Sequence, residues 1–231
     1  QKVSFVGNYN ATVYMSENAI YVGYSYEGDL IKFYYDFLKE NNDLVNKDIL
    51  DKLERLMGYD ISQQSKMSEL QIIISELESS LDDDEALKFE NEMENRMASY
   101  LKLHKRDLTK TDIVKIKIDN FKVDALGTIP GTLLNQFSLD EHKGNLRIAA
   151  TIGGGFWGNS GGEDENDIYV MDNNLKIIGS IKGLGLDERI YSVRFIEDKG
   201  YLVTFRQVDP FFVLDLGDPK NPAVKGELKI P

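Results

Sequence analysis

Hydrophobic and polar residues follow three successive patterns along the chain. From residue 1 to about 30, β-branched and aromatic residues gather in short runs at 12–15 and 20–23, and the turn-forming residues 16–18 separate them. This arrangement is typical of a β-hairpin. We therefore expect the chain to begin with strands.

The second pattern covers residues 31 to about 106. Apolar residues recur there at spacings of three and four, as in the series Leu70, Ile73 and Leu77, which is the period of a helix. Small and acidic residues at 58–60 and 79–84 interrupt the series. At least three helices are expected. Their many acidic residues are typical of a helical face in water, with a partner-binding surface or a cation site as the alternative.

From about residue 109 the strand pattern returns, and it contains an internal repeat. Segments 168–172 and 211–215 each read as a strand that ends in aspartate, and these aspartates, Asp172 and Asp215, are 43 residues apart. A third version ends at Asp119. The strand that follows each carries a glycine: Gly127, Gly179 and Gly226. Such a period is that of a four-stranded propeller blade, in which the aspartate side chain would bind its own turn.

The predicted fold is mainly β. It consists of about three four-stranded β-propeller blades with an α-helical insertion. Residues 1–30 supply the first strands, 31–108 the insertion between strands of the first blade, and 109–231 the remaining blades. Closed propellers need about 4–8 blades, so we expect an open piece of a larger propeller with an apolar blade face at each end. Further blades or self-association with a second copy would cover those faces.

Three segments carry a family resemblance. Residues 133–151, 190–210 and 226–231 resemble the secreted β-propeller domain family of archaea and bacteria, which is distantly related to WD-repeat proteins. The helical stretch, with residues 110–115 at its exit, is similar to an insertion found in that family. The resemblance implies an extracytoplasmic propeller whose chain continues with further blades. It implies no reaction.

Composition limits the partners of the chain. A net charge of -12 and a pI near 4.7 disfavour nucleic acid, because binding a phosphate backbone requires clustered basic residues. The chain has no cysteine, so thiolate metal sites and disulfides are excluded. Its longest apolar runs have the length of strands, and we expect no membrane insertion by this chain. The absence of a signal peptide leaves localisation to the family resemblance.

No catalytic residue is predicted. Residues 158–162 match the nucleophile-elbow pattern around Ser160, but that pattern requires a strand before it and a helix after it. Here a glycine-rich loop leads into a strand. Neither His104 nor His142 is placed by the repeat beside Ser160, so both are interpreted as surface residues.

One metal site is a candidate. Glu163, Asp164, Glu165 and Asp167 concentrate the carboxylate oxygens that Ca²⁺ prefers. The ordered spacing of a calcium loop is missing, so a solvated loop is the alternative. We expect the loop 153–165 to be mobile and sensitive to protease, and millimolar calcium would protect it if it binds the ion. No other cofactor is predicted.

Two functions of different classes remain open from the sequence. The first is a non-catalytic extracytoplasmic propeller scaffold that binds a protein or a cell-surface polymer. The alternative is a hydrolase or lyase whose active site lies in the propeller channel and is completed by blades missing from this chain. An exposed apolar or aromatic patch would favour the scaffold.

Overall fold

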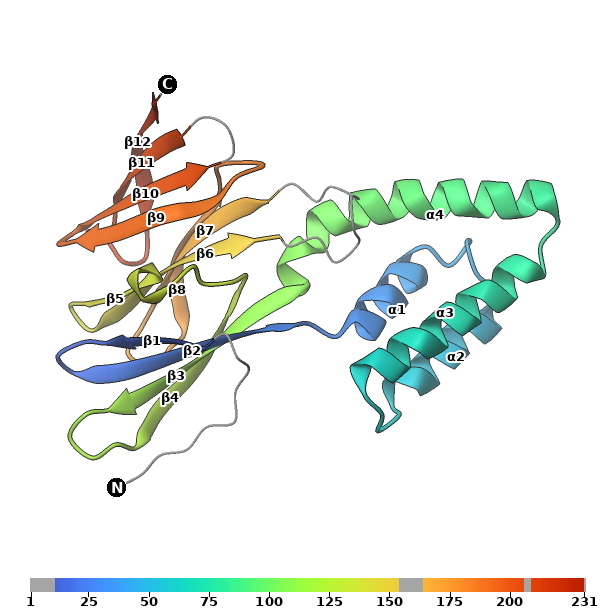
Figure 1. Cartoon of the computed structure of the whole chain (residues 1–231), viewed down its shortest axis with the longest axis horizontal. Helices are drawn as coiled ribbons and strands as arrows, with labels where there is room; N and C mark the ends of the chain where they lie inside the picture. Colours follow the sequence, from blue (N-terminus) through green and yellow to red (C-terminus); the bar gives the residue numbers. More distant parts are fainter. Residues whose placement is uncertain (1–10, 154–163, 206–208, 231) are drawn as a thin grey trace. The chain divides into compact units, whose positions relative to one another are not determined.

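Figure 1 shows the computed structural model of the chain, which describes residues 11–153, 164–205 and 209–230. In these ranges twelve strands form three four-stranded antiparallel sheets, which we number in chain order. Sheet 1 contains β1 (Ala11–Met15), β2 (Ala19–Glu27), β3 (Thr109–Lys117) and β4 (Val123–Pro130). Sheet 2 contains β5 (Leu139–His142), β6 (Asn145–Ile152), β7 (Glu165–Met171) and β8 (Ile177–Leu184). Sheet 3 contains β9 (Arg189–Ile196), β10 (Lys199–Phe205), β11 (Asp209–Asp215) and β12 (Ala223–Ile230).

A helical unit interrupts sheet 1 between its neighbouring strands β2 and β3. The chain divides into this compact unit, Glu27–Leu108, and a second unit made of Gln1–Tyr26 with Thr109–Pro231. The helices are α1 (Leu30–Glu40), α2 (Lys47–Met57), α3 (Gln63–Ser79) and α4 (Asp83–His104), followed by the short 3-10 turn η1 (Lys105–Asp107). The three sheets and the inserted helices confirm the predicted fold class. The break between α1 and α2 was not expected.

The start of α4 explains why an acidic stretch folds as a helix. Asp82 accepts a hydrogen bond from the Glu85 amide over 2.9 Å, and the Glu85 side chain reaches back to the Asp82 amide. This capping box satisfies two amides that have no partner within the helix. Further along α4, the Tyr100 ring packs edge-on against Phe33 and Phe37 of α1 at 5.1 and 5.3 Å. The helical unit therefore has a core of its own.

Sheet 2 lies between the other two sheets and is buried on both faces. Successive residues of a strand point to opposite faces. Ile148 and Ala150 of β6 accordingly pack in one core with Tyr21 of sheet 1, whereas Ala149 packs in a second core with Leu202 of sheet 3. Nearly every residue of β6 and β7 is buried, as expected for a middle blade in a stack.

A β-bulge recurs near the end of the third strand in every sheet. The pairing shifts by one residue between Lys115 and Ile116, between Val170 and Met171, and between Val213 and Leu214. Asp172 and Asp215 each come one residue after the bulge, and their carboxylates accept from turn amides as predicted, for example from the Gly217 amide over 3.0 Å.

The third copy of the repeat is shifted from its predicted place. Counted from the bulge, Lys117 and not Asp119 is the counterpart of Asp215. The charges are reversed at this position. Lys117 pairs with Asp124 over 2.9 Å, and Asp215 pairs with Lys225 over 3.0 Å, where Asp124 and Lys225 are the extra residues of the two bulges. Sheets 1 and 3 thus carry the same ion pair with the two charges exchanged.

Candidate functional site

The first strands of the three sheets, β1, β5 and β9, are each the edge of their sheet. A hollow of about 450 Å³ opens where they meet, and we call it the inner-strand hollow. Its lining comes from all three sheets and from the 3-10 turn η2 (Gln136–Ser138): Val13, Tyr14, Met15, Gln136, Phe137, Leu139, Asp140, Arg194 and Phe195. Most of these side chains are apolar, and the polar ones are few.

The exposed groups of the hollow that could contact a ligand are an arginine and an aromatic ring. The guanidinium of Arg194 lies 3.8 Å from the centre of the Phe137 ring, within the range of a cation–π contact. One of its nitrogens donates to the carbonyl oxygen of Val193 over 2.9 Å, and no described carboxylate forms an ion pair with it. Phe137 is 46% exposed. Arg194 therefore keeps donors available to a carboxylate from outside.

A second arginine, Arg147, contacts two lining residues of the hollow, Asp140 and Phe195, and is bonded within the protein. Arg147 is 3% exposed; its Nε donates to Asp140 over 2.9 Å, and another nitrogen donates to the carbonyl oxygen of Glu197 in sheet 3. Its guanidinium also lies 5.2 Å from the centre of the Phe195 ring. A buried charge is stable only when it is paired and hydrogen-bonded in this way. Arg147 is thus a structural residue that joins sheets 2 and 3.

Glu141 of β5 joins sheets 1 and 2 beside the hollow. Its carboxylate accepts from Ser16 over 2.6 Å, from Asn18 over 2.8 Å and from the Tyr21 hydroxyl over 2.9 Å. Burial by itself would raise the pKa of Glu141, but the hydrogen bonds outweigh burial and hold that pKa below its ordinary value. Burial, with the Glu141 carboxylate beside it, raises the pKa of Tyr21, which stays a neutral donor.

The next pair of sheets repeats this contact. Asp198, in the turn between β9 and β10, accepts from Lys143 over 2.7 Å and lies 3.1 Å from Nε2 of His142. Lys143, followed by His142, lowers the pKa of Asp198. In both cases donors in the first turn of one sheet bind an acidic residue in the first hairpin of the following sheet. These contacts join neighbouring sheets at their first hairpins.

The candidate calcium ligands are only partly described. Glu163 lies outside the described residues. Asp164 is 3.4 Å from Nε of Arg189, and Glu165 is buried in β7. Asp167 is fully buried and accepts from the Tyr169 hydroxyl over 2.6 Å and from the Gly183 amide over 2.9 Å. Within the described ranges no cluster of three acidic or histidine side chains is suited to a metal. The calcium site stays a prediction.

The other sequence candidates do not enter the hollow. Ser160 lies outside the described residues, as does most of the loop expected to be mobile. His104 stacks on Tyr100 with ring centres 4.0 Å apart in the helical unit, and His142 faces Asp198. Neither arginine was predicted from the sequence. A charged residue inside the apolar run of β6 signals a buried ion pair at Arg147, whereas Arg194 has no comparable signal.

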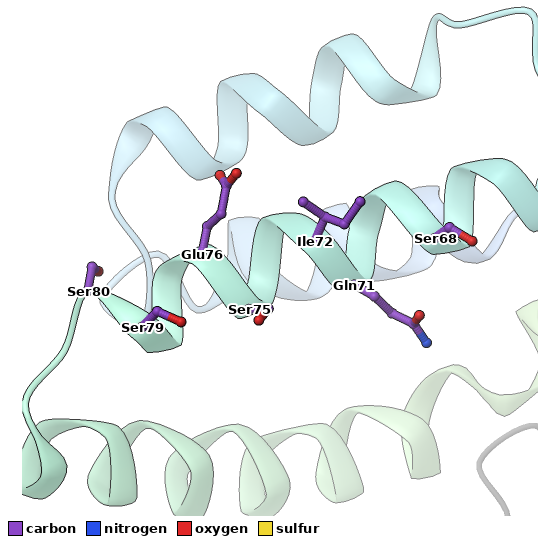
Figure 2. Close-up of a pocket in the computed structure, with 7 residues that line it drawn as sticks. All are labelled: Ser68, Gln71, Ile72, Ser75, Glu76, Ser79 and Ser80. Atoms are coloured by element: carbon purple, nitrogen blue, oxygen red, sulfur yellow. The ribbon is translucent and has the colours of Figure 1, made fainter.

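A second hollow lies along α3 in the helical unit. Its volume is about 680 Å³. Figure 2 shows the residues that line it, all of them on α3 or at its end: Ser68, Gln71, Ile72, Ser75, Glu76, Ser79 and Ser80. Glu76 already pairs with Lys52 of α2 over 2.8 Å. The remaining side chains are mostly small hydroxyls on one helix. This surface lacks the convergent groups of a ligand site.

Comparisons with known proteins agree with the blade-like form of the three sheets. The sequence model of a family described as beta propeller domain matches residues 1–231. An uncharacterized protein of Archaeoglobus fulgidus is 50% identical over 230 residues, which are 99% of this chain and 36% of that protein. An uncharacterized protein of Methanocaldococcus jannaschii is 38% identical over 231 residues, with the same two shares.

The chain thus spans about a third of the length of these curated relatives. No solved structure matches. None of the described helices is long and apolar enough to cross a membrane. Since the family match extends over the whole sequence and the blade-like sheets agree with it, the chain belongs to the beta propeller domain family.

Proposed function

We propose that this chain is a non-catalytic, extracytoplasmic propeller scaffold that holds a segment of another protein, or a cell-surface polymer, in the inner-strand hollow. The observation that carries the proposal is Arg194 stacked on the exposed Phe137 among apolar side chains. Arginine, phenylalanine and methionine are enriched in protein interfaces, and an arginine recognises a carboxylate through two parallel hydrogen bonds. The extracytoplasmic location rests on the family resemblance.

Charge favours a protein segment over an anionic polymer. The chain carries a net charge of -12, which repels a polyanion along its whole length. A peptide that presents one carboxylate among apolar residues meets Arg194 without that repulsion, because charges beyond about 8 Å are screened at physiological salt. The expected ligand is therefore an apolar peptide segment with a single acidic group.

Selection from a displayed library of random peptides tests this ligand. We expect the selected peptides to combine one acidic residue with apolar neighbours, and the Arg194→Gln variant to bind them at least about tenfold more weakly. Arg189→Gln, a substitution of the same charge on the same strand but outside the hollow, is the matched control and should bind normally.

Parallel assays decide between the alternatives. Binding of neutral and acidic polysaccharides to the parent chain, Arg194→Gln and Arg189→Gln is measured by calorimetry. Binding of a polysaccharide that depends on Arg194, without peptide binding, would show that the ligand is a polymer. Turnover of glycan or ester substrates that is lost when the lining of the hollow is changed would overturn the non-catalytic assignment.

A further inference from the structure

Two glycines on outer strands mark where one sheet receives the next. A Cβ atom added at Gly127 of β4 would lie 2.5 Å from the carbonyl oxygen of Leu175, in the turn between β7 and β8. A Cβ atom added at Gly179 of β8 would lie 2.3 Å from the carbonyl oxygen of Pro219, in the turn between β11 and β12. Only glycine permits such an approach of backbone to backbone. The outer turn of each following sheet thus rests on a glycine of the sheet before it.

Sheet 3 carries the corresponding glycine on an open surface. Gly226 of β12 pairs with Val213 beside the β-bulge, as Gly179 pairs with Val170. A Cβ atom added at Gly226 would meet nothing within 4 Å. The bulge-adjacent position that receives a turn in sheet 2 is therefore exposed in sheet 3.

The surface around Gly226 is apolar. By strand pairing, Leu228 shares this face with Phe211 and Val203, and the rings of Tyr201 and Phe211 stack at 5.9 Å. Leu228 is 62% exposed and Phe205 is 51% exposed. The residues at the matching positions of sheet 2 lie beneath sheet 3 and are buried: Arg147, Ala149, Ile168 and Val170. An exposed apolar face of this kind marks a contact with another protein surface.

The opposite end of the stack shows the complementary kind of face. Sheet 1 packs one face on sheet 2 and leaves apolar side chains exposed on the other, among them Leu126, which is 68% exposed. In sheets 2 and 3 the same kind of face covers the preceding sheet. A blade with such a face fits the surface around Gly226.

We propose that a further propeller blade of the longer family polypeptide covers the Gly226 face of sheet 3 and rests the carbonyl of its outer turn on Gly226. The relatives are long enough to contain such a blade, because this chain spans only 36% of each of them. Gly226 lies on β12, at the opposite edge of sheet 3 from the β9 residues of the inner-strand hollow. The occupant of this face is thus independent of what the hollow binds.

Thiol labelling of Leu228→Cys tests the proposal. The chain has no cysteine, so one introduced thiol reports alone. The substitution is made in the 231-residue chain and at the aligned position of the full-length Archaeoglobus fulgidus relative, and labelling is followed by peptide mass spectrometry. We expect rapid labelling of the 231-residue chain and labelling at least about 100-fold slower in the full-length relative.

Two further positions calibrate the measurement. Leu103→Cys, at a site 78% exposed on α4, should label rapidly in both proteins, and Ala149→Cys, fully buried between sheets 2 and 3, should label slowly in both. Equal, rapid labelling of Leu228→Cys in both proteins would overturn the proposal. So would protection that rises with concentration in the 231-residue chain while the full-length relative stays unprotected, because the occupant would then be a second copy.

Discussion

At the scale of single residues, the sheets are joined by a few polar side chains that serve two sheets at once. Glu141 gathers three donors from sheet 1, and Arg147 reaches a carbonyl oxygen of sheet 3. A hydrogen bond to a charged group contributes more than a neutral one, and it is directional. These residues therefore fix the relative position of neighbouring blades, which apolar packing alone leaves less defined.

The hydrogen bonds of Glu141 should make stability depend on pH. We expect Glu141→Gln to lower the free energy of unfolding at pH 7 by about 1–2 kcal/mol. Because the pKa of Glu141 is lowered in the folded state, its contribution is present above the unfolded-state value of about 4.3 and is lost as the pH falls through the folded-state value. Urea unfolding from pH 7 to pH 3 should show the two proteins converging.

The control for this experiment is Glu227→Gln, an exposed glutamate on β12. Its difference from the parent should stay within about 0.5 kcal/mol at every pH. A constant difference between Glu141→Gln and the parent down to pH 3 would contradict the role given to the carboxylate.

The repeat glycines allow a matched comparison at residue scale. Gly179→Ala places a Cβ atom against a backbone oxygen and should cost about 1–3 kcal/mol. Gly226→Ala meets open space in the 231-residue chain and should be neutral or stabilising by up to about 1 kcal/mol. Chemical denaturation of both variants measures the difference, and similar losses would show that Gly179 is not closely covered.

At the scale of elements, hydrophobic period predicted most strands and helices, and it failed where register decides. Asp119 and Gly127 match the repeat by residue type, yet the β-bulge assigns the position of Asp215 to Lys117. A bulge shifts side chains by one residue without changing composition, so the sequence pattern does not reveal it. The inner-strand hollow was missed for a related reason: its lining comes from three sheets that are distant in sequence.

The acidic start of α4 is the element whose sequence signal was clearest. Asp82→Ala removes the capping box and should destabilise the helical unit by about 1 kcal/mol. Asp84→Ala, an acidic residue of the same turn without the capping role, should cost less, because it loses only its attraction to the helix dipole. Thermal unfolding followed at the helix signal of circular dichroism compares them, and equal effects would exclude a specific cap.

At the scale of the whole molecule, the chain leaves sheet 1 after β2 to form the helical unit and returns to sheet 1 at β3. The ends of the helical unit meet there: the Gly28 amide donates to the carbonyl oxygen of Leu108 over 2.8 Å. Among the described residues, neither core of the three-sheet unit contains one from the helices. Strand pairing across β2 and β3 therefore needs the two ends to be close and does not need the helices between them.

Replacing residues 29–107 by a short glycine–asparagine turn should leave the three sheets folded. We expect the loss in unfolding free energy to stay below about 2 kcal/mol, because loop-closure entropy changes slowly with loop length. Circular dichroism and amide hydrogen exchange of β6 and β7 provide the measurement. A shortened chain without protected amides in these strands would show that the helices are required to fold the sheets.

The meeting of Gly28 and Leu108 also has a consequence for how such proteins diverge. An element that leaves and re-enters a hairpin at one point can be gained, lost or exchanged by a single genetic event, without a change in the order of the strands. Its length and its surface can then evolve independently of the blades, because each doubling of the inserted length costs strand pairing only about 0.6 kcal/mol. The helical insertion can thus differ between related proteins while the strands of the propeller keep their order.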